Sequence, residues 1–267
     1  MRLYFRKAPV VEINVQLQWL PLNGIVVPPR SAAVIQLGGE EEWFTLFASQ
    51  VAAMGFTQSE RLVPMGAPVV PYQPIYRYRA SSNSTVMFQL GQGVFSVNAM
   101  PPYRTWDHFS PLVRGGLSSL LTALPPQHKN NPFHLVQVRY VNILADEILQ
   151  GLSPTRFVTE TLNWHMKLPT ALHQSIDMST ADAFFVRSRF RVNDSVNLLV
   201  NVGEVLQHGK PVALLDLLAE MTNVEPSDET IIGAVENMHG VIHKIFVELV
   251  DPIRDLLEPD WEDDRHV

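Results

Sequence analysis

Residues 10–19 read VVEINVQLQW, and this stretch decides the fold class of the chain. Apolar side chains stand at every second position from Val11 to Trp19, where they alternate with Glu12 and three amides. A period of two is typical of a β-strand that is buried on one face and wetted on the other. The stretch therefore predicts a sheet with one covered face and one open face.

Short strands recur along the chain and are separated by turn-forming residues. The runs at 75–80, 85–90 and 94–100 are joined by polar or glycine-rich turns, which suits an antiparallel meander. Further strands are predicted over 133–144, 162–168, 183–192, 195–205 and 211–221. Over 162–168 the prediction rests on the alternation of Leu162, Trp164, Met166 and Leu168.

Three helices are predicted between these strands. Residues 38–56 carry acidic residues near their N-terminal end and Gly55 as a stop signal. Thr105 is expected to cap a second helix over 105–124. A long third helix is predicted from about Asp228, and Pro252 should kink or end it.

Each half of the chain thus combines antiparallel strands with a helix that follows them. The turn-rich segment 150–155 is the best candidate boundary, so the halves are residues 1–150 and 151–267. We expect an α+β fold in which helices pack on one face of antiparallel sheets. The arrangement is either two helix-on-sheet halves or one continuous curved sheet, with a long C-terminal helix.

Composition excludes several classes of function. The chain has no cysteine, which rules out disulfides and thiolate chemistry. Its formal charge of −7 argues against a protein whose main affinity is non-specific attraction to nucleic acid or anionic lipid. Neither a secretory signal nor an apolar run of about 20 residues is present, so we expect a cytoplasmic protein without a membrane partner.

Two histidines raise the question of a metal site. His239 and His243 lie four residues apart in the long predicted helix, so both imidazoles share one helical face. A metalloprotease motif needs glutamate directly after the first histidine, and Gly240 stands there. A di-iron site needs a second Glu-x-x-His, which the chain lacks. The favoured interpretation is a histidine at the edge of the core, with no cofactor.

Arginines at alternate positions are the more suggestive feature. Arg187, Arg189 and Arg191 project from one side of a predicted strand, and Arg77 and Arg79 repeat the pattern. Such a row can bind phosphates or an acidic partner surface. The alternative is a solvated sheet face whose arginines are balanced by carboxylates on a neighbouring strand.

Two residues of the central strand complete the candidate binding set. Arg139 and Asn142 are predicted to join the other arginines in contacting a partner. A buried arginine that is paired to a carboxylate such as Glu12 would produce the same sequence pattern. The sequence leaves both interpretations of Arg139 open.

The common catalytic signatures are absent. The chain has no Gly-x-Ser-x-Gly elbow and no Gly-Lys-Ser/Thr phosphate loop. Gly38 and Gly39 do precede a predicted helix, but the three glutamates at 40–42 would repel a phosphate at its N-terminus. We therefore predict no catalytic residues and favour a binding protein over an enzyme.

Several segments together resemble a known family. They are APVVEINVQLQW at 8–19, the motifs between 76 and 109, VRYVN at 138–142, and LLDLLAE and MHGVIHKIFVELV near the end. In this order they are similar to a sporadically distributed prokaryotic protein family of uncharacterised function. The segment 81–84 departs from the Asp-Gly-like turn of that family. The family's patchy occurrence implies gene mobility, as among defence, toxin–antitoxin and immunity modules.

These observations lead to a ranked set of functional hypotheses. The first is a non-catalytic regulatory, antitoxin-like or immunity-like protein that acts through a protein partner encoded nearby. The second is a nucleic-acid-binding or -processing protein that uses the same arginines, with Glu12, Arg139, Asn142 or His239 in catalysis. The third is a metal enzyme built on His239 and His243. Each allows a homo-oligomer.

Overall fold

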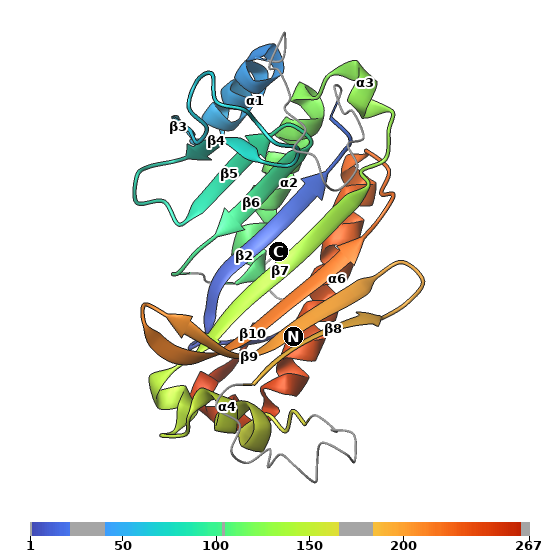
Figure 1. The fold of residues 1–267 in the computed structure, drawn as a ribbon. Coiled ribbons are helices and arrows are strands. Elements are labelled where there is room, and N and C mark those ends of the chain that lie inside the picture. Colours follow the sequence, from blue (N-terminus) through green and yellow to red (C-terminus); the bar gives the residue numbers. More distant parts are fainter. Residues whose placement is uncertain (1, 22–40, 103–104, 166–183, 263–267) are drawn as a thin grey trace.

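The computed structural model describes residues 2–21, 41–102, 105–165 and 184–262. Within them, nine strands form one antiparallel sheet in the order β3-β4-β5-β6-β2-β7-β10-β9-β8 (Figure 1). The strands are β2 (Val10–Gln18), β3 (Gln58–Arg61), β4 (Pro74–Arg79), β5 (Val86–Gly91), β6 (Val94–Ala99), β7 (Leu135–Leu144), β8 (Phe185–Arg191), β9 (Asn197–Gln207) and β10 (Lys210–Met221). The sheet runs unbroken across both halves of the chain.

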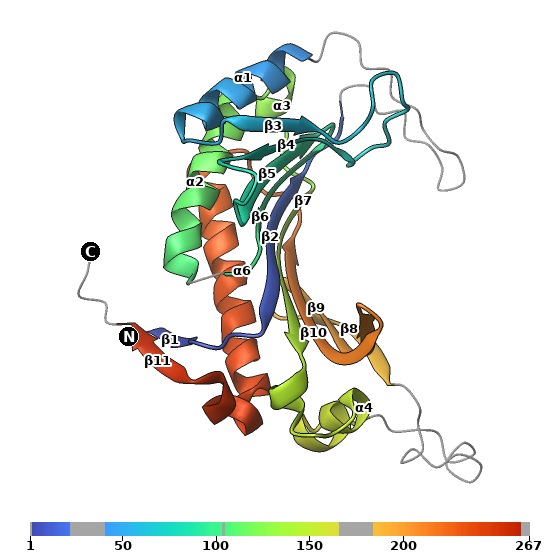
Figure 2. The same cartoon turned by 90° about the vertical axis from the view of Figure 1, so that its left-hand side faces the viewer.

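Three main helices cover one face of this sheet. They are α1 (Glu41–Ala53), α2 (Trp106–Ala123) and α6 (Asp228–Leu249). Figure 2 shows these helices on one side and a sheet that curves away from them at both ends, so the open face is concave. Short helical segments lie at the two ends of the molecule: α3 (Pro126–Lys129), α4 (Pro154–Arg156) and the turns Asp146–Leu149, Phe157–Thr161 and Asp251–Leu257.

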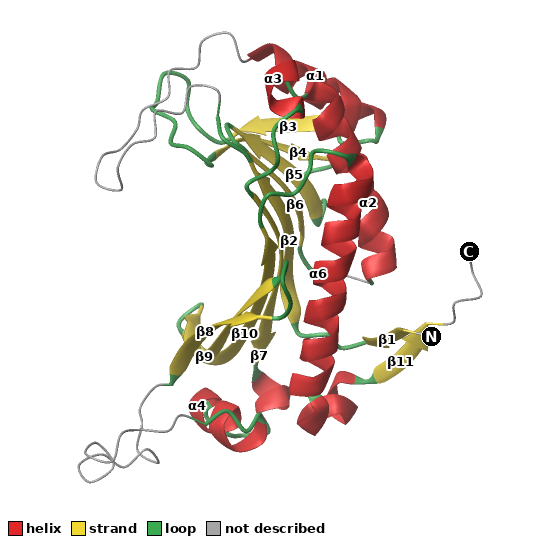
Figure 3. Ribbon diagram, turned by 90° about the vertical axis from the view of Figure 1, so that its right-hand side faces the viewer, coloured by secondary structure: helices red, strands yellow, loops and turns green. Residues whose placement is uncertain are grey.

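A small second sheet stands apart from the main one. Strand β1 (Arg2–Phe5) pairs antiparallel with β11 (Pro259–Glu262). Figure 3 shows this pair beside α6, on the side away from the main sheet. The first and last described strands therefore pair on the helical side of the molecule.

The strand order has an internal correspondence between the halves. Strands β2 and β7 pair at the centre, and each is followed outward by a three-stranded meander: β6, β5 and β4 on one side, β10, β9 and β8 on the other. A helix follows each meander in sequence, α2 in the first half and α6 in the second. The alternation in residues 10–19 positions this centre, because Ile13, Val15 and Leu17 are fully buried under the helices.

Glycine allows α2 to approach the sheet closely. A Cβ atom on Gly116 would lie 2.7 Å from Cε1 of Phe88 and 3.1 Å from Cζ of Phe95. These two rings are fully buried and belong to the core that α1, α2 and the first meander share. Gly116 lowers the helix propensity of α2, but the close packing of α2 against these two rings requires a residue without a side chain.

The predicted α+β class, with helices on antiparallel strands, is confirmed. The long C-terminal helix begins at Asp228, where the Ser227 hydroxyl accepts a hydrogen bond from the Thr230 N–H, and it ends at Leu249, before Pro252. No helix in the described residues combines the length and apolarity needed to cross a bilayer.

The strand predicted over 162–168 is wrong where the structure describes it. Residues Phe157–Thr161 form a helical turn, and the Leu162 N–H donates to the Phe157 carbonyl at its end. Ser153 caps the preceding helix α4, and Pro154 is the first residue of that helix. This helix-start signal outweighs the strand-like alternation of the residues that follow it. Residues 166–168 lie outside the described residues.

Candidate functional site

The open face of the sheet carries all six arginines of the predicted binding set. Strand registers show this, because cross-strand partners project from the same face. Arg139 opposes Asn14 on β2, and Asn14 opposes Asn98 on β6. Arg79 and Arg189 lie in this same row, and Arg77, Arg187 and Arg191 lie in neighbouring rows of the same face.

One such row is polar on every strand of the sheet. It crosses the concave face from edge to edge and includes two arginines and two carboxylates among amides and a hydroxyl. Its members are Glu60, Arg77, Gln89, Ser96, Gln16, Gln137, Glu220, Asn197 and Arg191. A face with mixed charge and many amides suits hydrogen bonding more than non-specific attraction of a polyanion.

Arg139 is held by a carboxylate of the neighbouring strand. Its Nε and Nη2 donate to the two carboxylate oxygens of Asp216 at 2.8 and 2.9 Å, and Asn201 Nδ2 donates to the same carboxylate at 2.8 Å. The Asp216 side chain is 4% exposed and that of Arg139 is 44% exposed. Hydrogen bonding to Asp216 raises the pKa of Arg139. The carboxylate is therefore Asp216, with Glu12 a weaker electrostatic neighbour.

The remaining arginines divide into paired and unpaired groups. Arg77 contacts Glu60 at 3.2 Å, and Arg189 forms an ion pair with Glu220. Arg79, Arg187 and Arg191 form no ion pair with any residue that the structure describes, and Arg79 contacts the sulfur of Met87. Balance by neighbouring carboxylates thus accounts for Arg77, Arg139 and Arg189, and within the described ranges it leaves one arginine without an ion pair on β4 and two on β8.

Strand β8 is an edge of the sheet, and hydrogen bonds at both of its ends show which of its residues bond to β9. The Val192 N–H donates to the Val196 carbonyl at 2.9 Å, and the Glu204 N–H donates to the Phe184 carbonyl at 2.8 Å. Bonded pairs alternate along an antiparallel ladder. The even-numbered residues of β8 therefore bond to β9, and the odd-numbered residues turn their N–H and C=O groups away from it.

These odd-numbered residues include all three β8 arginines. Arg187, Arg189 and Arg191 thus each present two groups to a partner. Their guanidinium groups lie on the concave face, and their backbone N–H and C=O groups point outward along the edge of the sheet. The strand is also apolar at the surface, since Phe185 is 52% exposed and Phe190 is 48% exposed.

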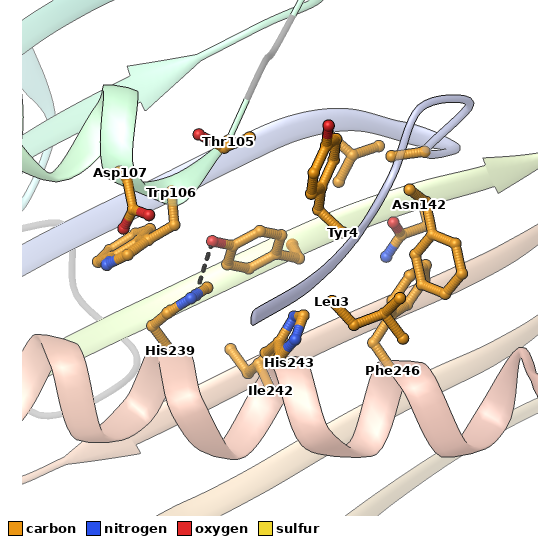
Figure 4. A pocket seen from close by; sticks show the side chains of 14 residues that line it. Leu3, Tyr4, Thr105, Trp106, Asp107, Asn142, His239, Ile242, His243 and Phe246 are labelled. Atoms are coloured by element: carbon orange, nitrogen blue, oxygen red, sulfur yellow. Dashed lines mark hydrogen bonds between the residues drawn. The ribbon is translucent and has the colours of Figure 1, made fainter. Parts of the chain in front are cut away.

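Asn142 and the two histidines lie on the other side of the sheet. The alternation of β7 places Asn142 on the helix-covered face, opposite to Arg139. There it lines a cavity together with Tyr140, His239, His243 and residues of β1 (Figure 4). The structure therefore separates Asn142 from the arginines with which the sequence grouped it.

The cavity wall is organised by a chain of ring contacts. His239 is 4% exposed and stacks on Trp106, with ring centroids 4.1 Å apart and planes inclined by 8°. The Tyr140 hydroxyl lies 2.9 Å from His239 Nδ1, and Trp106 Nε1 donates to Glu236 at 2.8 Å. These contacts fix the imidazole as part of the wall and occupy its Nδ1 and one ring face.

The histidine pair has few further ligand groups around it. The rings of His239 and His243 are 5.8 Å apart. Within the described ranges, no three or more His, Asp or Glu side chains are grouped as they would be around a metal ion. Chemically, the site offers a tyrosine–histidine contact within an aromatic enclosure.

The cavity was not predicted from the sequence. Its walls come from β1, the start of α2, β7 and α6, which are remote in the chain. The available signal was the pair Tyr140 and Asn142, two polar-tipped side chains on the buried face of a strand. Buried polar groups of this kind commonly have partners or ligands.

No protein-family model matches the chain, and neither a curated protein nor a solved structure matches it. The resemblance to the sporadically distributed family therefore stays a prediction from its motifs.

Proposed function

We propose that this chain is a non-catalytic binding protein that takes an acidic, extended segment of a partner protein as an added strand along β8. The observation that carries the proposal is the hydrogen-bond pattern between β8 and β9. This pattern leaves the backbone groups of the three arginine residues pointing outward from the edge. An added strand would bond to that edge, and its acidic side chains would lie beside Arg187, Arg189 and Arg191. This activity suits the regulatory, antitoxin-like or immunity-like role suggested by the resemblance.

The chemistry of the edge favours a polypeptide over a nucleic acid. The outward groups of β8 include carbonyl oxygens as well as N–H groups, and a phosphate backbone can satisfy only the donors. The open face also carries the carboxylates Glu12, Glu60, Asp216 and Glu220, which repel phosphate. A peptide strand supplies both donors and acceptors, with alternate side chains directed to the arginines.

A defined peptide tests the proposal. The probe is a short peptide of alternating glutamate and valine, and its control has the same composition with the glutamates and valines in two blocks. Only the alternating peptide places all its acidic groups on one face when extended. We expect saturable binding of the alternating peptide, with amide shift changes in NMR spectra centred on β8.

Two substitutions at one position separate the backbone contribution from the charge. Arg189→Ala removes the guanidinium and leaves the outward N–H, whereas Arg189→Pro removes both and is compatible with an edge strand. We expect Arg189→Pro to weaken peptide binding at least about fivefold more than Arg189→Ala, the worth of about one hydrogen bond. Equal losses would refute strand addition.

Charge reversal on the two edges locates the surface. The Arg187→Glu/Arg189→Glu/Arg191→Glu variant should abolish binding of the alternating peptide. The matched Arg77→Glu/Arg79→Glu variant, on β4 of the same face, should leave it unchanged. Binding of single-stranded DNA that falls steeply with salt and is lost in the β8 variant would support nucleic-acid binding instead.

A further inference from the structure

The cavity between α6 and the main sheet has the size and lining of a small ligand site. It has a volume of about 90 Å³, and its walls include the rings of Phe5, Trp106, Tyr140 and Phe246. A water molecule occupies about 30 Å³, and an apolar cavity of about 150 Å³ can hold benzene. The volume thus limits an occupant to one small ring, seated partly at the mouth.

The wall of the cavity contains a side-chain acceptor of a buried residue. Asn142 is 1% exposed, and its Nδ2 donates to the Leu215 carbonyl at 3.0 Å. This bond fixes the orientation of the amide, because the carbonyl of Leu215 requires a donor. Oδ1 of Asn142 receives no hydrogen bond from the residues that the structure describes, and the amide points into the cavity (Figure 4).

An amide oxygen that faces an enclosed cavity indicates what a matching ligand carries. An acceptor that faces a cavity and has no protein donor is satisfied by water or by a ligand that donates to it. The ligand that matches Asn142 Oδ1 therefore has an N–H or O–H group attached to an otherwise apolar body.

The charge of the described lining favours a neutral ligand over an anion. Among the residues that the structure describes, no lysine or arginine lines the cavity, and the exposed Asp107 stands beside Thr105 in its wall. A carboxylate or phosphate would lose its hydration without gaining a cationic partner. Tyrosine, tryptophan and phenylalanine rings at the walls favour a flat occupant through edge and face contacts.

We propose that this cavity binds a small neutral aromatic molecule whose single O–H or N–H group donates to Asn142 Oδ1. The cavity lies on the helix-covered face of the sheet, opposite to the β8 arginines, so the inference is independent of partner binding. β1 covers the cavity with Leu3, Tyr4 and Phe5, and it pairs with β11 outside the main sheet. A ligand can thus be enclosed without breaking a strand pairing of the main sheet.

Three probes of similar size distinguish the features of the proposal. Phenol has the donor, toluene replaces the hydroxyl by a methyl group, and benzoate carries a negative charge. Without an acceptor in the cavity, toluene would bind better than phenol, since phenol would lose a hydrogen bond to water. We expect phenol to bind about fivefold more tightly than toluene and benzoate not to bind, as measured by titration followed in NMR spectra.

Variants of the chain test the position of the ligand. Ala8 lines the cavity at an exposed position, so Ala8→Leu should fill the mouth and abolish phenol binding while leaving the fold intact. Ala52→Leu makes the same change at an exposed position of α1 and should leave binding unaltered. Asn142→Leu should reverse the preference to toluene.

The outcomes either support or overturn the inference. Saturable phenol binding that Ala8→Leu removes and Ala52→Leu preserves supports it. The inference is overturned if phenol does not bind to the unmodified chain. It is also overturned if toluene binds as tightly as phenol or more tightly, or if benzoate binds more tightly than phenol. Ala8→Leu keeps the test decisive if Asn142→Leu does not fold, since the Leu215 carbonyl loses its donor in that variant.

Discussion

Removing either partner of the Arg139–Asp216 pair should have very unequal effects on stability. Arg139→Met keeps the apolar stem of the side chain but leaves the Asp216 carboxylate almost completely buried, with Asn201 as its remaining hydrogen-bond donor. Asp216→Leu leaves a guanidinium that is 44% exposed and can turn into water. The cost therefore depends on which charge stays behind.

The magnitudes follow from this difference in burial. Loss of one partner from a buried ion pair costs about 3–5 kcal/mol, and the partial exposure of Arg139 puts Arg139→Met near about 3 kcal/mol. Asp216→Leu should cost about 1 kcal/mol, because the freed guanidinium is solvated. The double variant should also cost about 1 kcal/mol, which makes the coupling energy about 3 kcal/mol.

Urea unfolding of the four proteins at neutral pH measures these values. Far-ultraviolet circular dichroism and tryptophan fluorescence should report the same transitions, as two-state analysis requires. A larger loss for Asp216→Leu than for Arg139→Met, or a coupling energy below about 0.5 kcal/mol, would refute the reasoning. In the expected case Arg139 is a structural residue, and Arg139→Met should leave peptide binding at β8 unchanged.

Two further predictions concern glycine packing and pH. Gly116→Ala should lower the free energy of unfolding by about 1–2 kcal/mol, because overpacking against Phe88 exceeds the gain of about 1 kcal/mol in helix propensity. Gly240→Ala, which meets nothing within 4 Å, should raise it by about 0.5–1 kcal/mol in the same urea assay. Burial lowers the pKa of His128 and His134, so the folded protein binds fewer protons and loses stability as the pH falls through about 6.5. The melting temperature of His128→Gln/His134→Gln should therefore fall less than that of the unmodified chain between about pH 7.5 and about pH 5.5, and equal falls would contradict this.

Helices and strands were predictable where the apolar residues of a segment repeat with one clear period. Alternation in β2 reports burial on one face, and this burial is a local property of the strand. The order of strands was not predictable, because β2 pairs with β6 and β7 across long stretches of chain. The sequence therefore left open whether the halves form one sheet or two.

The same distinction explains the candidate site. The shared face of Arg187, Arg189 and Arg191 follows from their spacing within one strand. That Arg77 and Arg139 lie on this face requires the register of every intervening pair. The cavity depends on four separate segments, so no periodicity could have indicated it.

The two edges of the sheet differ in a way that strengthens the argument for β8. The first edge is β3, a short strand of four polar residues, Gln58–Arg61, and short polar edges resist pairing with another chain. The opposite edge has seven residues, Phe185–Arg191, with exposed phenylalanines and outward-facing backbone groups. An edge of this kind promotes aggregation unless something covers it or repels its own copies. The β8 arginines repel a second β8, because like charges would lie opposite one another across the new pairing. Under the proposed function the same charges would attract an acidic strand, so one set of residues would both disfavour self-pairing and select the partner.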